Sequence, residues 1–148
     1  MDTKNNSKTI GFVILFFIIF LIAFTSFFIG VNLNESKETI VNFINNQIKI
    51  SGNYGTEIEV GSIKKIALLN TLPTVNKKII GFNNGNTLKG DFDLENFGTS
   101  KLYVYTGKPP YLYIYTIDDK VVIINYEDNK KTENLYKEML ELLNNTNK

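Results

Sequence analysis

Residues 101–125 read KLYVYTGKPPYLYIYTIDDKVVIIN, the most regular pattern in the chain. Apolar or aromatic side chains recur at every second position, and β-branched and aromatic residues dominate, which is typical of half-buried strands. Gly107-Lys108-Pro109-Pro110 and Asp118-Asp119 divide the stretch, and both contain residues that favour tight turns. The pattern predicts three strands, over residues 101–106, 111–117 and 120–125.

The same short β-rich runs continue toward the N-terminus, separated by the turn sequences Gly52-Asn53-Tyr54-Gly55 and Asn83-Asn84-Gly85. No gap long enough for a helix separates them, so we expect antiparallel meanders rather than βαβ units. Six further strands are predicted, over residues 40–44, 47–51, 57–60, 63–69, 77–82 and 89–96.

One helix is expected after the strands, over residues 130–143, with Asn129 as its N-cap. Apolar side chains recur on one side of it at helical spacing. These are Leu135, Tyr136, Met139, Leu140, Leu142 and Leu143. We expect this apolar stripe to pack onto the open end or face of a curved sheet.

A series of landmarks runs from Ile48 to Leu143. They are Tyr54-Gly55, Ile58, Ile63, Ile66, Leu68, Leu72-Pro73, Gly90, Phe92, Gly98, Leu102-Tyr103, Pro110-Tyr111, Ile114, Thr116, Asn125, Thr132 and Leu135-Tyr136. In this order they resemble the bacterial PH-like (pleckstrin-homology-like) domains of small membrane-associated proteins. Ile80-Gly81 departs from that family's pattern, in which a polar residue precedes the glycine. The resemblance implies a mostly-β barrel or sandwich of about seven antiparallel strands closed by the C-terminal helix, with a binding or scaffolding role and no catalytic residue.

The N-terminal part of the chain has a different character. No charge occurs between Lys8 and Glu35, and the only polar side chains in residues 10–31 are Thr25 and Ser26. As a helix this run spans about 30 Å, the thickness of the hydrocarbon core of a bilayer. We therefore predict a flank over residues 1–9, a transmembrane helix over 10–31, a tether over 32–38 and the PH-like domain over 39–148.

A cleavable signal peptide is the alternative, because Ala23-Phe24-Thr25 resembles a cleavage site. The apolar run continues past that point, which favours an uncleaved anchor in the lipid bilayer. Lys4 and Lys8 precede the run closely, whereas Lys37 and Lys49 follow it at wider spacing. This bias predicts a single-pass cell-membrane protein with a cytoplasmic N-terminus and an extracytoplasmic domain.

The chain contains no Cys, His or Trp, and all 16 of its basic residues are Lys. This composition excludes disulfides, Cys/His zinc sites, Cys nucleophiles and imidazole bases. No phosphate-binding glycine motif is present, and we predict no cofactor and no metal site. The acidic pairs Asp91/Asp93, Glu57/Glu59 and Asp118/Asp119 are interpreted as solvated strand edges and turns.

Tyrosines provide the strongest local signal for binding. Alternation places Tyr103 and Tyr105 on one face of their strand, and Tyr111, Tyr113 and Tyr115 on one face of the next. If the intervening turn brings the two sets together, they form a cross-strand aromatic patch for a partner. The alternative is ordinary half-buried β-formers.

Basic doublets occur at Lys64/Lys65, Lys77/Lys78 and Lys130/Lys131, yet residues 32–148 carry fourteen Lys and fourteen Asp or Glu. This balance predicts no nucleic-acid binding. We expect a non-enzymatic scaffold or sensor that binds another protein or peptide at the membrane. Direct binding of anionic lipid headgroups through Lys77 and Lys78 is the alternative, and an enzyme of unknown type is a distant one.

Overall fold

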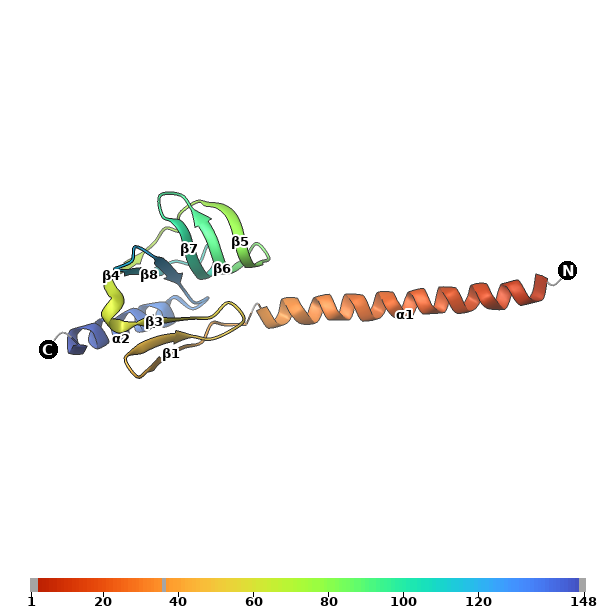
Figure 1. The fold of residues 1–148 in the computed structure, drawn as a ribbon, viewed down its shortest axis with the longest axis horizontal. Helices are drawn as coiled ribbons and strands as arrows, with labels where there is room; N and C mark the ends of the chain where they lie inside the picture. Colours follow the sequence, from red (N-terminus) through yellow and green to blue (C-terminus); the bar gives the residue numbers. More distant parts are fainter. Residues whose placement is uncertain (1–2, 36, 147–148) are drawn as a thin grey trace. The chain divides into compact units, whose positions relative to one another are not determined.

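The structure is a computed structural model that describes residues 3–35 and 37–146. The chain divides into two compact units, Met1–Lys37 and Glu38–Lys148. Figure 1 labels most of the elements of both units, and each unit is described separately below.

The first unit contains one helix, α1 (Thr3–Glu35), so the helix continues past residue 31 into the segment predicted as a tether. Its residues Ile10–Gly30 have a mean hydropathy of 3.0, and none of this span is buried. The hydroxyl of Thr25 donates to the carbonyl of Leu21 at 2.9 Å, which satisfies a polar group within the helix itself. The helix is long and apolar enough to cross a membrane, and an N-terminal signal sequence would share these properties.

The second unit begins with a small antiparallel sheet in the order β1-β2-β3. Its strands are β1 (Val41–Ile44), β2 (Gln47–Ile50) and β3 (Thr56–Glu59). Asn45 and Asn46 connect β1 to β2, both with positive φ, at 50° and 63°. Asparagine tolerates this left-handed conformation, and a two-residue turn of this kind matches the twist of a hairpin.

A short 3-10 helix, η1 (Val60–Ser62), leads into a six-stranded sheet in the order β4-β8-β9-β7-β6-β5. All nine strands expected between residues 40 and 125 are present. The six in this sheet are β4 (Ile63–Leu69), β5 (Val75–Asn83), β6 (Thr87–Leu94), β7 (Gly98–Tyr105), β8 (Tyr111–Thr116) and β9 (Val121–Ile124).

The sequence predicts antiparallel pairing throughout, and this is wrong for one pair, because β9 runs parallel to β7. After β7 the chain forms β8, which does not pair with β7. β9 follows β8 in the sequence and lies between these two strands. Asn125, which has no exposed surface, holds this crossover. Its side chain accepts from Tyr105 N at 2.6 Å and donates to the carbonyls of Tyr105 at 3.0 Å and Lys108 at 2.5 Å.

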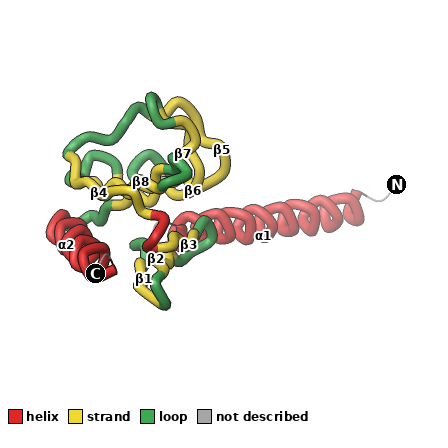
Figure 2. Tube along the Cα trace, turned by 60° about the vertical axis from the view of Figure 1, so that its left-hand side comes forward, coloured by secondary structure: helices red, strands yellow, loops and turns green. Residues whose placement is uncertain are grey.

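The six-stranded sheet is curled (Figure 2). One of two hydrophobic cores lies against its inner face. Alternation along β7 and β8 sends Leu102 and Tyr113 into this inner core, and Tyr103 and Leu112 into a second core on the opposite face. The small sheet and the C-terminal helix contribute to the second core through residues such as Ile48 and Met139. Both faces of the central strands are therefore buried.

Gly81 and Gly90, which lie opposite each other on β5 and β6, allow these two strands to approach closely. A Cβ on Gly81 would lie 2.2 Å from the carbonyl oxygen of Lys89, and one on Gly90 would lie 2.4 Å from that of Ile80. Both residues have positive φ. The sequence anomaly at Ile80-Gly81 thus lies within a strand, at a close backbone contact that requires glycine.

The C-terminal helix, α2 (Asn129–Thr146), contacts β4, β8 and η1. Leu135 and Met139 are buried in the second core, as the apolar stripe predicts. The predicted N-cap is displaced by one residue, because the Asp128 carboxylate accepts from Lys130 N at 3.0 Å and Asn129 lies within the helix. An aspartate side chain at this position satisfies a free N–H of the first turn.

Candidate functional site

A groove of about 720 Å³ crosses the surface of the second unit where the two sheets meet. One wall is β3, and the other consists of the first half of β7 and the β8–β9 turn. The lining comprises residues 56–59, 99–101, 116–118 and 120–122, together with Ser62 and Asp91. Apolar side chains of Ile58, Ile117, Val121 and Val122 contribute to it.

The groove opens because β9 is shorter than its neighbour. β7 begins at Gly98, but the parallel pairing with β9 begins only at Lys101 opposite Val122. Residues 98–100 of β7 thus have no strand on the β9 side. β3 is the edge of its own sheet, so alternate N–H and C=O groups of both walls point away from their paired neighbours.

Carboxylates outnumber ammonium groups in the lining, which carries Glu57, Glu59, Asp91 and Asp118 against Lys101 and Lys120. Asp91 and Lys101 face each other across β6 and β7, 2.9 Å apart, and both side chains are largely shielded. All three acidic pairs identified in the sequence therefore contribute to this groove. Glu57 and Glu59 both line it, whereas the other two pairs contribute Asp91 and Asp118. Asp91 and Asp118 are paired with lysines of the lining and Glu57 with Lys49 outside it, which leaves an excess of one carboxylate, Glu59, to favour a cationic ligand.

The carboxylate of Asp118 has a partner on each of its two oxygens. Lys120 Nζ lies 2.6 Å from one oxygen, and the hydroxyl of Thr116 donates to the other at 2.5 Å. The hydrogen bond from Lys120, followed by that from Thr116, lowers the pKa of Asp118. This side chain is consequently ionised at neutral pH.

The arrangement offers little for covalent chemistry. The Ser62 hydroxyl donates to the carbonyl of Glu59 at 2.7 Å and so fixes the turn. Within residues 3–35 and 37–146, no three His, Cys, Asp or Glu side chains are placed to hold a metal ion. Strand edges, an apolar lining and fixed charges are features of a peptide-binding surface.

No family model, curated protein or solved structure matches this chain.

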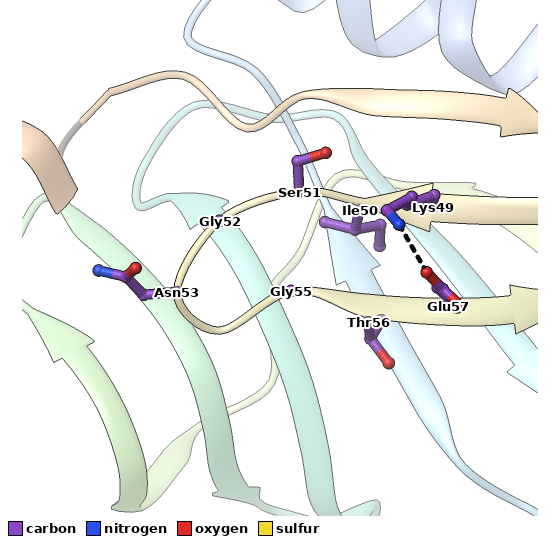
Figure 3. Close-up of a pocket in the computed structure, with 8 residues that line it drawn as sticks. All are labelled: Lys49, Ile50, Ser51, Gly52, Asn53, Gly55, Thr56 and Glu57. Atoms are coloured by element: carbon purple, nitrogen blue, oxygen red, sulfur yellow. Dashed lines mark ion pairs between the residues drawn. The ribbon is translucent and has the colours of Figure 1, made fainter.

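A second hollow, of about 500 Å³, lies at the β2–β3 connection (Figure 3). Lys49 and Glu57 pair across the two strands at 2.8 Å, and this contact raises the pKa of Lys49. Gly55 permits the tight turn, since a Cβ there would lie 2.5 Å from the carbonyl of Ile50. The Tyr103 hydroxyl donates to the carbonyl of Tyr54 at 2.5 Å and ties the loop to the core. The hollow is therefore a consequence of the tight β2–β3 turn, and we assign it no binding role.

The tyrosines predicted as a partner-binding patch lie in different places. Tyr103 is in the core shared with the small sheet, whereas Tyr111 and Tyr113 are in the inner core, and all three are buried. Tyr105 and Tyr115 are half-buried. The cross-strand patch does not form because β9 separates β7 from β8. Alternation along a strand defines its faces but not its neighbour.

The hydroxyl of Tyr113 and the ring faces of Tyr113 and Tyr115 have structural partners. Tyr113 donates to the carbonyl of Thr71 at 2.7 Å, and its ring stacks on that of Tyr115 with centroids 6.0 Å apart. The Lys65 ammonium lies 4.5 Å from the centre of the Tyr115 ring. Burial raises the pKa of Tyr113 to about 12, with smaller contributions from Tyr115 and Tyr111.

The lysines of the lipid-binding alternative, Lys77 and Lys78, are both exposed on β5, away from the groove. Sequence reasoning had identified the acidic pairs but interpreted them as separate solvated edges. It missed the contribution of Thr99 and Ile117 to the groove, because both are ordinary strand-end residues. Only the packing of the small sheet against the six-stranded sheet, which places β3 across the groove from β7 and the β8–β9 turn, could have indicated them.

Proposed function

We propose that this protein is a membrane-anchored, non-catalytic module whose second unit binds an extended segment of another protein in the groove. The observation that carries the proposal is the pair of strand edges, β3 and residues 98–100 of β7, that flank an apolar lining. Edges of this kind accept an added strand through main-chain hydrogen bonds, and side-chain pockets between them provide specificity. The excess of carboxylates favours a segment with basic residues.

The relation to PH-like domains is part of this proposal. Its support is the order of the elements, in which a run of strands precedes a single C-terminal helix with Leu135 and Met139 in a core. The division into sheets of three and six strands, and the parallel β7–β9 pair, are departures from the expected antiparallel arrangement. The binding proposal rests on the groove and does not depend on that relation.

Fluorescence anisotropy with the full chain in detergent micelles tests the binding role. The probe is a short labelled peptide that alternates Lys and Val, and its companion alternates Glu and Val. We expect the basic peptide to bind and the acidic one not to. Saturable binding of neither peptide, or equal binding of both, would contradict the proposal.

Two isoleucine variants locate the binding site. Ile117 is 67% exposed in the groove lining, so Ile117→Lys introduces a repelling cation without disturbing a core. We expect it to weaken binding of the Lys–Val peptide by about tenfold, equivalent to about 1.4 kcal/mol. Ile44→Lys is the matched control, at an isoleucine of β1 that is 51% exposed outside the groove. Equal affinities of the two variants would contradict the location.

The anchor is tested separately. Full-length protein of 16.9 kDa should remain with the membrane pellet after alkaline extraction, because residues 10–30 have no water-compatible face. A shortened product in the soluble fraction would identify the apolar helix as a signal sequence. For orientation, a membrane-impermeant maleimide should label Asn84→Cys in intact cells, since the chain has no cysteine of its own.

A further inference from the structure

β5 is an edge strand of the six-stranded sheet and exposes five consecutive residues, 76–80. The last four form an unusual run of two charged and two large apolar side chains, Lys77, Lys78, Ile79 and Ile80. Ile79 and Ile80 keep 48% and 61% of their surface exposed. Soluble proteins usually protect an edge strand with charges or bulges and do not place adjacent large apolar side chains there. This run therefore has the composition of a contact surface.

In each of the other two basic doublets, at least one lysine side chain has a partner. Lys64 pairs with a carboxylate 3.8 Å away, Lys65 lies over an aromatic ring, and Lys131 pairs with a carboxylate at 2.8 Å. Within the described residues, neither Lys77 nor Lys78 has an ion-pair partner. Both ammonium groups thus remain available to an external anion.

The carboxylates nearest in the sheet offset this charge only in part. Asp91 is paired with Lys101 at 2.9 Å. Asp93 lies opposite Lys77 in the register and accepts from the neutral amide of Asn76 at 3.3 Å. Strands β5, β6 and β7 together carry four Lys and two Asp, and Glu95 follows β6 directly, so four cations stand against three carboxylates. The second unit is balanced in charge as a whole, but this end of the sheet is positive, whereas the groove is negative.

The shape of β5 discriminates between possible partners. Its pairing with β6 is interrupted twice, between Val75 and Lys77 and between Lys78 and Ile80. The second interruption leaves Ile79 as an extra residue, which bends and twists the strand. An incoming β-strand needs a regular edge, so these interruptions disfavour a protein strand. A bilayer surface has no register and tolerates them.

We propose that residues 77–80 of β5 dock onto the surface of an anionic bilayer. The ammonium groups of Lys77 and Lys78 would lie among the headgroup phosphates, and Ile79 and Ile80 would enter the boundary between headgroups and acyl chains. This interaction is independent of peptide binding in the groove. It would give the second unit a preferred contact with the membrane beyond the one provided by α1.

Fluorescence quenching in nanodiscs tests this proposal with the full chain, which has no native cysteine. A fluorophore is placed at Ile80→Cys, and the matched control is Ile117→Cys, at an isoleucine with 67% exposure. Lipids brominated on their acyl chains serve as the quencher. In phosphatidylglycerol discs we expect quenching at position 80 but not at position 117, and in phosphatidylcholine discs we expect it at neither.

Charge variants then test the lysines. In the Ile80→Cys background, Lys77→Gln with Lys78→Gln should lower the ratio of docked to undocked protein by about 25-fold, since each lysine near an anionic leaflet contributes about fivefold. Lys64→Gln with Lys65→Gln, on the opposite edge strand, should change it little. Equal quenching at both positions, no dependence on phosphatidylglycerol, or equal effects of the two doublets would overturn the proposal. Concentration-dependent protection of position 80 in lipid-free micelles would instead indicate self-association through β5.

Discussion

Replacing Asn125 by alanine tests whether one buried side chain maintains the unusual strand order. Asn125 follows β9 directly, and its amide group makes three hydrogen bonds to the segment that crosses from β7 to β8. Alanine removes all three and leaves Tyr105 N–H and two carbonyls without these partners. Leucine would fill the volume but would leave the same groups unsatisfied.

The size of the stability loss depends on how well water can take over the hydrogen bonds of the Asn125 amide. Lys108 is exposed, so its carbonyl can be rehydrated, whereas Tyr105 is half-buried and its two groups are less accessible. Two unsatisfied groups at about 1 to 3 kcal/mol each predict a loss of about 2 to 6 kcal/mol in the free energy of unfolding. That is a large part of the roughly 5 to 15 kcal/mol that stabilises a typical domain.

Urea unfolding of the full chain in micelles, followed by tyrosine fluorescence, measures this loss. Asn144→Ala is the control, because Asn144 is exposed on α2, and we expect it to cost less than about 0.5 kcal/mol. Asn125→Asp keeps the acceptor but loses the donor, so its deficit should be smaller at about pH 4, where protonation restores an O–H, than at neutral pH. Similar stabilities of Asn125→Ala and Asn144→Ala would refute the reasoning.

Three further outcomes are expected. Met139→Ala, at a fully buried position of α2, should cost about 2 to 5 kcal/mol in urea unfolding, and a loss below about 0.5 kcal/mol would mean that the helix is undocked. Gly81→Ala should destabilise the chain strongly, because its Cβ would meet a carbonyl oxygen at 2.2 Å, whereas Gly61→Ala, with nothing within 4 Å, should not. Burial raises the pKa of the Tyr103 and Tyr113 phenols; the stability associated with them is present below the unfolded value of about 10 and is lost as the pH rises above it. Absorbance at a tyrosinate wavelength should therefore rise together with loss of circular dichroism, and ionisation of all tyrosines without unfolding would contradict this.

The positions of the strands are predictable from the sequence because their signal is local. Ile63–Leu69 coincides with the expected strand, and the others agree to within a few residues. The Leu135 and Met139 stripe also predicts a buried helix face correctly. The positive φ of Asn45 and Asn46 is not among the predictions. Two asparagines between β-rich runs are nevertheless a recognisable signal for such a turn.

The order of the strands was not predictable, and the errors about the site follow from it. Nothing local in residues 106–110 indicates that the chain will leave space for a later strand. The resulting crossover buries both faces of β7 and β8, which removes Tyr103 and Tyr113 from the surface. It also leaves residues 98–100 without a strand on the β9 side, beside the β8–β9 turn, and thereby opens the groove. Long-range pairing of this kind depends on the packing of the whole domain.

The insertion of β9 between β7 and β8 has a consequence for synthesis. A nascent chain that has emerged only as far as residue 116 contains β7 and β8 but lacks β9, which pairs with both. It also lacks α2, which packs on the second core. Its open edges would expose apolar rows to other chains on the ribosome. We therefore expect assembly to wait until β9 and α2 have been synthesised. Premature termination after β8 should yield aggregated or rapidly degraded product and not a smaller folded domain.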